Sequence, residues 1–418
     1  MGIHSNGTTS NNGIPLRSVY LDHAATTGVL PEVVDAIIPY YTEKYGNPSS
    51  VHAWGRAAHQ GMEAARRQVS VVLGCRPREV VFTSGGTESD NLAMKGVAWA
   101  YRRGLNPTRQ PSEGPGHIII SAIEHHAIIH SAEELEQHGF EITSVPVDSY
   151  GLVNPDDVAR AMRPDTVLVS IMYANNEIGT IQPVRRIADI AHAGGAYFHT
   201  DAVQAGGYLS LNVNELGADM LSLSAHKFYG PKGIGVLYIK NGTAILPIQH
   251  GGSQESRRRA STENVPGIVG LGAALTRAHG KLQAESEYVG TLRDRLVTGI
   301  MERIPGAHFM GHPTQRLPNN ANFCIEGIEA ETLLLKLDMR GIGASSGAAC
   351  ASGSTEPSHV LRALGIPRDL AEGSLRLTLG IDNSAEDIDY TLEVLQSCVA
   401  ELRASEPALQ AQPTLPRQ

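Results

Sequence analysis

The sequence is poor in cysteine, in aromatic residues and in positive charge. Only 4 of its 418 residues are cysteines, and they lie far apart without any short paired spacing. This excludes a disulfide framework and a cysteine-rich zinc site, and it favours a reducing, cytoplasmic environment. The 34 basic residues are outnumbered by 43 acidic ones, so the formal charge is −9 and we expect no nucleic-acid partner.

Long apolar runs are also missing. No stretch approaches the roughly 20 apolar residues that a membrane-spanning helix needs, and no basic segment leads into an apolar one at the start, so we expect no membrane association. Aromatic residues make up 5% of the chain, whereas 44 residues are glycine. This balance favours an α/β protein with many tight turns over an aromatic-rich β-sandwich.

Short apolar runs alternate with longer helical patterns over much of the chain. Four of these runs span residues 80–82, 117–120, 167–171 and 196–199. The alternation predicts a mainly parallel sheet with crossover helices. Only a short turn separates the runs 220–223 and 235–239, so we expect one antiparallel pair at the edge of this sheet.

The pattern changes near residue 267. A long helical pattern runs from about 267 to 304 without a strand, and strand patterns follow near 321–325 and 374–379. We therefore expect a large domain over residues 18–266 and a smaller α+β domain over 267–404.

The two ends of the chain differ from these domains. Residues 1–17 are rich in Asn, Gly, Ser and Thr, and residues 405–418 are rich in Pro, Gln and Ala, so both are predicted to be flexible tails. Residues 18–30 are a candidate for packing against the small domain.

Polar and small residues follow five of the predicted strands. These clusters are 84–87, 124–126, 175–177, 201–204 and 224–227. Ligands in open α/β sheets bind beyond the carboxyl ends of the strands, so we expect the five clusters to converge on one site.

The turn Ser84–Glu88 lies between a predicted strand and a predicted helix. Its glycines and the helix N-terminus suit one phosphate, although a plain tight turn with Thr87 as the helix cap is an equal alternative. The glycine-rich fingerprints of nucleotide-binding sites are missing from the sequence.

Lys227 and Asp201 together suggest a cofactor with a ring nitrogen. A lysine in a partly buried pocket can form a Schiff base, although a loop lysine is more often solvated. Asp201 favours the Schiff-base lysine over the solvated one, because a carboxylate that faces a pyridine nitrogen would keep that nitrogen protonated and electron-withdrawing.

The histidines after the second predicted strand suit a ring better than a metal. His126 and His130 are one helical turn apart, but no third ligand of a suitable type is adjacent, so we expect no metal site. His125 could instead stack on a planar ring, or it could be a structural histidine that caps a helix.

Cys350 and Arg376 are the remaining candidates. Cys350 lies in a run of small residues that offers no core, which predicts a mobile loop with an accessible thiol. Arg376 lies within a strand pattern, where it either holds a carboxylate through two hydrogen bonds or faces solvent.

Taken together, these segments resemble the cysteine desulfurases, which are pyridoxal-phosphate enzymes of the class V aminotransferase group with the type I fold. The resemblance runs from Tyr20 to about Leu395, and residues 356–361 look like the group with a long, mobile cysteine loop. The segments that carry it are Tyr20–Thr27, Tyr45–His52, Phe82–Ser89, Asn175–Gly179, His199–Gln204, Ser224–Lys227 and Ser345–Cys350.

The resemblance implies pyridoxal 5'-phosphate as the cofactor and assigns residues around its ring. Lys227 would hold the cofactor through a Schiff base, and His125 would stack on the ring and take part in catalysis. Asp201 would pair with the ring nitrogen, and Asn176 and Gln204 would contact the oxygen side of the ring.

The phosphate would be held by two glycine and hydroxyl clusters and by a second subunit. Gly86, Thr87, Ser224 and His226 would come from the same chain, and Thr262 would come from the partner in a homodimer. Related enzymes usually have glycine before this threonine, whereas Ser261 stands there in this sequence.

The implied reaction converts L-cysteine to L-alanine. Asn176 and Arg376 would bind the substrate carboxylate, and Cys350 would take the sulfur as a persulfide for iron–sulfur cluster assembly or another sulfur pathway. Cys350 could also contact an iron–sulfur cluster transiently during delivery to an acceptor or scaffold protein.

Two alternative readings stay open at this point. The chain could be a related selenocysteine lyase or aminotransferase, although simple transamination needs no nucleophilic thiol. It could also be a non-catalytic scaffold, against which Lys227, Asp201 and His125 all weigh.

Overall fold

The structure, a computed structural model, describes residues 17–111, 114–346 and 358–410, with side chains up to residue 404. The expected N-terminal tail, apart from Arg17, lies outside the described residues. Cys350 lies outside them as well.

The strands form one large sheet, one small sheet and a two-stranded pair. They are β1 (Val19–Tyr20), β2 (Val80–Thr83), β3 (His117–Ser121), β4 (Glu141–Val145), β5 (Thr166–Ser170), β6 (Tyr197–Asp201), β7 (Met220–Ser224), β8 (Gly235–Ile239), β9 (Ala307–Phe309), β10 (Asn320–Ile325), β11 (Ile342–Gly343) and β12 (Ser374–Thr378).

Helices connect the strands and cover the sheets. They are α1 (Pro31–Ile37), α2 (Pro39–Thr42), α3 (Ala53–Leu73), α4 (Gly86–Arg102), α5 (His126–Gln137), α6 (Pro155–Ala161), α7 (Val184–Ala193), α8 (Val213–Leu216), α9 (Gln254–Arg257), α10 (Val265–Arg303), α11 (Ala330–Asp338), α12 (His359–Ala363), α13 (Arg368–Ala371) and α14 (Ala385–Gln410).

The large sheet has seven strands in the order β2-β8-β7-β6-β5-β3-β4. The pairs from β7 to β4 are parallel, whereas β8 is antiparallel to both of its neighbours. The predicted parallel sheet and the predicted antiparallel pair of β7 and β8 are therefore confirmed. The predicted position of this pair at the edge is wrong, because β2 pairs with the outer side of β8.

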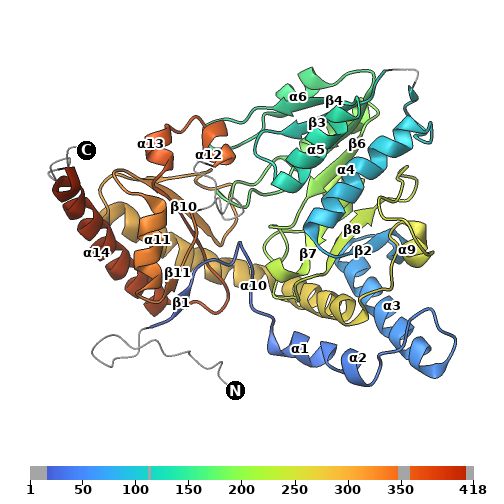
Figure 1. Ribbon diagram of the computed structural model, residues 1–418, viewed down its shortest axis with the longest axis horizontal. Helices are drawn as coiled ribbons and strands as arrows, with labels where there is room; N and C mark the ends of the chain where they lie inside the picture. The colour runs from blue at the N-terminus through green and yellow to red at the C-terminus, as the bar shows by residue number, and fades with distance from the viewer. Residues whose placement is uncertain (1–16, 112–113, 347–357, 411–418) are drawn as a thin grey trace, which may run out of the picture.

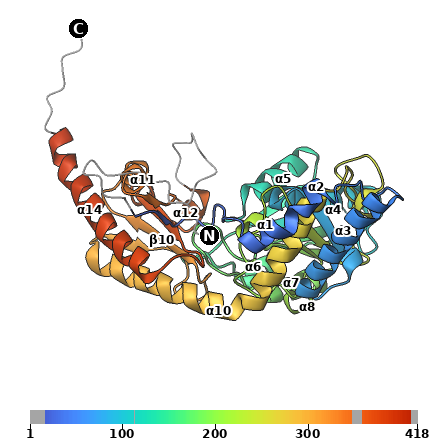
Figure 2. The same ribbon diagram turned by 90° about the horizontal axis from the view of Figure 1, so that it is seen from below.

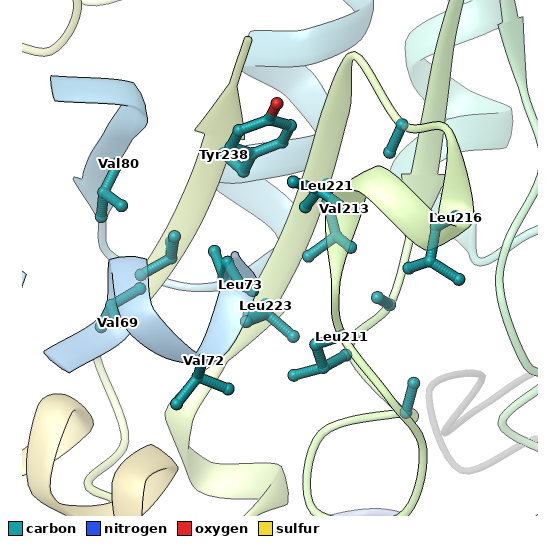
Figure 3. Packing of buried hydrophobic residues seen from close by; sticks show 14 of the residues in the cluster. Val69, Val72, Leu73, Val80, Leu211, Val213, Leu216, Leu221, Leu223 and Tyr238 are labelled. Atoms are coloured by element: carbon teal, nitrogen blue, oxygen red, sulfur yellow. The ribbon is translucent and has the colours of Figure 1, made fainter. Parts of the chain in front are cut away.

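Two helical layers enclose this sheet (Figure 1). Successive strand residues point to opposite faces, so Ile119 packs in the core beneath α3 and α7, while Ile118 and Ile120 pack in the core beneath α4 and α5. Figure 3 shows α3 side chains such as Leu73 against Leu223 of β7. A sheet that is buried on both faces explains the continuous apolar runs in the sequence.

The C-terminal part is built on a three-stranded antiparallel sheet in the order β12-β10-β9. Its core contains Phe323 and Leu377 from the sheet and Leu337 and Leu395 from α11 and α14. The expected α+β character of this part agrees with these elements. Helix α14 continues to Gln410, so the predicted start of a flexible tail at residue 405 falls inside a helix.

Helix α10 connects the two parts (Figure 2). Leu271 and Leu275 in its first half belong to the core of the large sheet, whereas Leu296 and Ile300 in its second half belong to the core of the small sheet. The predicted domain boundary at residues 266–267 thus falls at the beginning of a helix that both parts share.

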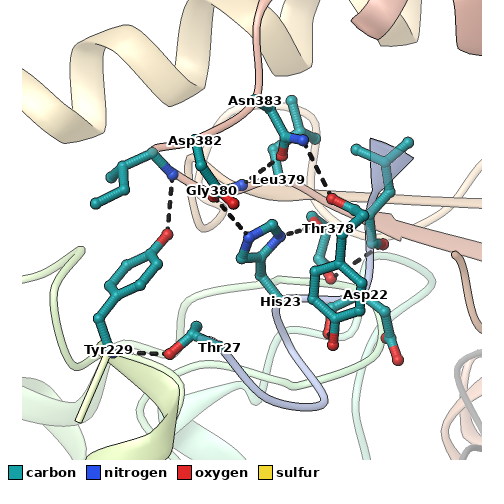
Figure 4. A network of polar contacts seen from close by, with 12 residues as sticks. Asp22, His23, Thr27, Tyr229, Thr378, Leu379, Gly380, Asp382 and Asn383 are labelled. Carbon is teal, nitrogen blue, oxygen red and sulfur yellow. Dashed lines mark hydrogen bonds and ion pairs between the residues drawn. The ribbon is translucent and has the colours of Figure 1, made fainter. Parts of the chain in front are cut away.

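A strap, residues 22–27, crosses between the two parts. Just before it, β1 pairs with β11, and Val19 and Leu21 lie in the core of the small sheet. His23 is buried, and its ring contacts the Thr378 carbonyl oxygen and an Asp382 carboxylate oxygen, each at 3.0 Å (Figure 4). The expected packing of this segment against the small domain therefore occurs at its first residues.

We expect Gly380→Ala to destabilise this crossing. A methyl group at Gly380 would overlap the His23 ring, which two hydrogen bonds hold in place. The free energy of unfolding should fall by about 1–3 kcal/mol, measured by urea denaturation. Gly28→Ala is the matched control, because nothing lies within 4 Å of its added methyl group. Equal losses in the two variants would contradict this account.

Candidate active site

The strand ends of the large sheet and one strand of the small sheet line a single cavity of about 380 Å³. It brings together most of the residues that the sequence singled out, namely Gly86, Thr87, His125, Asn176, Asp201, Gln204, Ser224, His226, Lys227 and Arg376. Thr262 is exposed and does not line this cavity. Cys350 lies outside the described residues.

Lys227 stands on a 3-10 turn, Ala225–Lys227, directly after β7. Its Nζ donates hydrogen bonds to the carbonyl oxygens of Ala24 at 2.6 Å and Ala25 at 2.8 Å. Gln204 Nε2 donates to the same Ala24 oxygen at 3.0 Å. The strap therefore supplies the acceptors that orient the amine in the cavity.

Asp201 ends β6 deep in the cavity. Its Oδ1 accepts a hydrogen bond from the Val203 backbone N–H at 2.9 Å. Burial raises the pKa of this carboxyl, while His125 and Lys227 favour its charged form. A partly compensated buried carboxylate of this kind suits a positively charged partner.

Asp90 of α4 lines the same cavity next to Asp201. Burial, and then the charge of Asp201, raise its pKa well above the usual range. His199 lies beneath it and has a pKa lowered to about 3 by burial, so the ring is neutral and hydrogen-bonded to Ser170 and Ser222. The two buried carboxylates repel each other, whereas His125 and Lys227 favour the charged form of Asp201.

His125 caps α5 where that helix meets the cavity. Its Nδ1 accepts a hydrogen bond from the Ala127 N–H at 3.1 Å, so a neutral ring carries its proton on Nε2. The preceding Glu124 is fully buried and accepts hydrogen bonds from the Ser121 hydroxyl and the Met172 N–H. Burial raises the pKa of Glu124 to about 8.

The glycine turn after β2 forms an open cradle. Gly85 precedes α4, and the first N–H groups of this 17-residue helix face the cavity edge beside Ser224 and His226. A methyl group at Gly86 would come within 2.7 Å of Val203 Cγ2, so a larger residue would narrow the cradle. Burial lowers the pKa of His226 to about 4, which leaves its ring neutral.

The segment before Thr262 is tied to the same helix. Arg259 Nε donates to Glu88 Oε1 at 2.8 Å, and the Ser84 N–H donates to Glu88 Oε2 at 2.8 Å. Although burial opposes it, these contacts hold the pKa of Glu88 below its usual value. The negative charge in the first turn of α4 is thereby compensated.

Arg376 reaches the cavity from β12 of the small sheet. Its Nη1 donates to the Asn176 carbonyl oxygen and its Nη2 to Asp22 Oδ1, each at 2.9 Å. The preceding Asn175 holds this turn, because its amide contacts Ile123, Glu177 and Ile178 of the main chain. The arginine therefore points into the protein and does not face solvent, which agrees with the first of the two alternatives given by the sequence analysis.

These features fit pyridoxal phosphate. A buried carboxylate lies at the cavity floor for the ring nitrogen, an amine stands at its side, and a helix N-terminus beside a glycine cradle is open to a phosphate. Among the described residues, no group of three or more His, Cys, Asp and Glu side chains is arranged to hold a metal ion.

Some cavity residues were not found from the sequence. Asp90, Met172, Ala174 and Val203 line the cavity, and Ala24 and Ala25 supply carbonyl oxygens. Every residue type has a backbone carbonyl oxygen, so side-chain chemistry alone could not have identified Ala24 and Ala25. Asp90 had a usable signal, because it lies one helical turn after Gly86.

Comparison with known proteins gives the family. The model of the family described as aminotransferase class-V matches residues 19–391. A protein named cysteine desulfurase IscS from Methanosarcina thermophila is 51% identical over 97% of this chain and 98% of its own length. A protein of the same name from Dictyoglomus turgidum is 49% identical over 94% of this chain and 97% of its own length.

Solved structures agree with these relatives. A NifS-like protein superposes with a TM-score of 0.85 at 38% identity, covering 92% of this chain and 100% of its own. A structure described as SspA in complex with cysteine superposes with a TM-score of 0.76 at 34% identity, covering 87% and 99%. The expected type I fold is thereby confirmed.

Within the described residues, no helix is both long and apolar enough to cross a membrane. The chain as a whole, with its cavity, its fold and its near full-length similarity to these proteins, belongs to the class V aminotransferases, in their branch of pyridoxal-phosphate-dependent cysteine desulfurases.

Proposed function

We propose that this cavity is where the enzyme takes sulfur from L-cysteine and that Cys350 receives this sulfur as a persulfide. The observation that carries the proposal is the meeting of Lys227, Asp201 and Arg376 in one cavity beside the glycine cradle. An amine, a ring-nitrogen partner and a carboxylate partner are the groups that amino-acid chemistry on pyridoxal phosphate requires.

Lys227 would hold the cofactor covalently, and His125 would stack on its ring. Asp201 would pair with the ring nitrogen, and Asn176 and Gln204 would contact the oxygen side of the ring. When bound, pyridoxal phosphate withdraws electrons from the substrate and weakens the bonds at its Cα. The compensated charge of Asp201 supports this placement, since a buried carboxylate is most stable beside a cation.

Gly86, Thr87, Ser224 and His226 hold the phosphate at the N-terminus of α4. The positive end of the helix dipole and the free N–H groups there favour an anion. Thr262 joins this site from the partner in a homodimer. Its exposure and its absence from the cavity of its own chain support this assignment.

Arg376 and Asn176 bind the substrate carboxylate, which places Cα near the amine of Lys227. Lys227 accepts the proton from Cα and returns protons as the product forms. The Cys350 thiolate attacks the substrate sulfur, so a sulfur–sulfur bond forms and the bond between that sulfur and Cβ breaks. The electron pair stays on carbon, which takes up protons and becomes the methyl group of alanine.

The other thiols support the choice of Cys350 as the acceptor. Burial raises the pKa of Cys75 and of Cys324 to about 12, and it raises the pKa of Cys398 as well. Thiols with such pKa values stay protonated at neutral pH and are poor nucleophiles. From Cys350, the sulfur passes to an acceptor or iron–sulfur scaffold protein. We place the enzyme in the cytoplasm, where free cysteines such as these three remain reduced.

We expect Lys227→Ala and Cys350→Ala each to abolish the coupled release of alanine and sulfide. With pyridoxal phosphate, L-cysteine and a reductant, the unchanged protein should release equal amounts of both products. In both variants the rate of alanine and sulfide release should fall by at least about 100-fold, because each substitution removes a group that takes part in bond breaking. Cys75→Ala is the matched control and should keep full activity. A Cys350→Ala protein that releases sulfide at the unchanged rate would contradict the persulfide step. It would favour assignment of the protein as another lyase or an aminotransferase.

We expect Thr262→Ala to weaken retention of pyridoxal phosphate by about tenfold, because a hydrogen bond to a charged group is lost. Thr291→Ala, at another exposed threonine, should retain the cofactor normally. In mixed dimers of a Thr262→Ala chain and a Lys227→Ala chain, the site with the intact Lys227 is completed by the unchanged Thr262 of the other chain, so this site should retain pyridoxal phosphate as tightly as in the unchanged protein. Retention as weak as in Thr262→Ala dimers would show that Thr262 does not act across the interface.

We expect Glu124→Gln to change how stability depends on pH. The folded-state pKa of about 8 lies above the value of about 4.3 for an unfolded chain. Between about pH 5 and 8 the folded protein therefore keeps a proton that the unfolded chain has released, and its free energy of unfolding falls as pH rises, by up to about 1.4 kcal/mol per pH unit. Glutamine imitates the protonated acid.

The variant should thus gain stability relative to the unchanged protein as pH rises from 5 to 8, measured by urea denaturation at each pH. Glu302→Gln on the surface is the control and should show no such trend. A constant difference between Glu124→Gln and the unchanged protein would mean that Glu124 is ionised in the fold.

A further inference from the structure

Arg376 is a buried cation with an incomplete set of partners. Its side chain is 3% exposed, and its Nε, also buried, has no hydrogen-bond partner among the described residues. Nη1 and Nη2 are bound to the Asn176 carbonyl oxygen and to Asp22. Arg376 lines the cavity, so an incoming carboxylate would meet a guanidinium whose hydrogen-bonding capacity is not fully used.

Asp22 is the ion-pair partner of this arginine, and no role was predicted for it from the sequence. The contact from Nη2 to Asp22 Oδ1 is 2.9 Å, and the Asp22 side chain is 20% exposed. One face of the carboxylate therefore reaches solvent while the other meets the guanidinium. The pair is charge-assisted and lies at the boundary of the cavity rather than in the open.

Backbone contacts fix Asp22 relative to Arg376. Asp22 forms a parallel bridge with Thr378, which lies two residues after Arg376 on the same strand. The Asp22 carbonyl oxygen also accepts hydrogen bonds from the Ala25 N–H at 3.0 Å and the Tyr20 hydroxyl at 3.1 Å. The carboxylate is thus presented to Arg376 by main chain that has little freedom to move.

A second acidic group, Glu177, also interacts electrostatically with this arginine. Glu177 is buried, accepts a hydrogen bond from the Ser358 hydroxyl, and has its pKa raised by burial. Asp22, in contrast, forms an ion pair with Arg376. The arginine therefore meets the substrate with part of its charge already balanced.

We propose that Asp22 is a positioning residue for substrate binding, which holds the plane of the Arg376 guanidinium and limits its attraction for the substrate carboxylate. The inference rests on the proposed role of Arg376 in binding that carboxylate. It assigns two separate effects to Asp22: the hydrogen bond sets the direction of the guanidinium, and the charge sets the strength of binding. A moderate affinity favours release of the amino-acid product, which carries the same carboxylate.

The two effects predict opposite outcomes for two substitutions. Asp22→Asn keeps an oxygen that accepts from Nη2 but removes the charge, so L-alanine should bind about three- to tenfold more tightly. Asp22→Ala removes both, so the guanidinium loses its fixed orientation and L-alanine should bind about tenfold more weakly. A purely structural role would weaken binding in both variants.

Binding is measured on the holoenzyme by titration with L-alanine, followed through the absorbance of the bound pyridoxal phosphate. Ethylamine, which is alanine without its carboxylate, is the matched probe, and its binding should not respond to either substitution. Asp382→Asn is the control protein. It removes a carboxylate that pairs with His23 on the same strap and should leave alanine binding unchanged.

Arg376→Lys separates this inference from the proposed function, because lysine cannot reproduce the fork of the guanidinium. If Arg376→Lys weakens alanine binding while both Asp22 variants shift it in one direction or not at all, the inference is overturned and the role of Arg376 stands. If Arg376→Lys leaves alanine binding unchanged, the carboxylate site itself is wrong. Should Asp22→Ala not fold, tighter binding by Asp22→Asn with unchanged ethylamine binding still decides the question.

Discussion

The strap, residues 22–27, is hydrogen-bonded at one end to β12 and at the other to the turn that carries Lys227, and the cavity depends on both contacts. At the first end the Thr378 N–H donates to the Leu21 carbonyl oxygen at 2.7 Å. At the second end the Ala24 and Ala25 oxygens accept from the lysine. The amine and the arginine belong to different sheets, so their separation would otherwise depend on how two independently packed units meet. Main-chain hydrogen bonds give the strap little freedom and so set this separation.

A second constraint is the negative charge beneath the cavity. Asp90, Glu124 and Asp201 are buried close together, and three ionised carboxylates in so small a volume would repel one another strongly. Nearby cations distinguish them. Asp201 accepts a hydrogen bond from the Val203 N–H and lies near His125 and Lys227, which favour its charged form, whereas one oxygen of Asp90 and one of Glu124 lack hydrogen-bond partners among the described residues. A single negative charge is therefore best accommodated on Asp201, where a ring nitrogen is expected.

The sequence predicted the parts of the fold and of the site that depend on local pattern. Continuous apolar runs predicted the buried strands, and the polar clusters followed at their carboxyl ends. In contrast, β4 (Glu-Ile-Thr-Ser-Val) is neither continuously apolar nor strictly alternating, and β1 is two residues long, so neither left a strong signal. The outer position of β2 depends on pairing with β8, which is distant in sequence. The domain boundary predicted at residues 266–267 coincides with the start of α10, a helix that both parts share. The carbonyl oxygens of Ala24 and Ala25 and the pairing of Asp22 with Arg376 arise only when distant segments meet. The roles of all the site residues, Thr262 and Cys350 included, remain predictions.

The described residues on either side of Cys350 are bound to Arg376, which is proposed to hold the substrate, and to neighbours in the chain of Asn176 and His125. Before it, Ser345 exchanges backbone hydrogen bonds with Arg376, the arginine proposed to bind the carboxylate. After it, the Ser358 hydroxyl donates to Glu177, which follows Asn176, and His359 Nε2 donates to the carbonyl oxygen of the residue before His125 at 2.9 Å. Any movement of Arg376 or of the Asn176 turn when a carboxylate binds therefore acts directly on both flanks of the cysteine. The described residues that flank this part of the chain and the proposed carboxylate site thus share contacts, through the main chain at Ser345 and through side chains at Ser358 and His359.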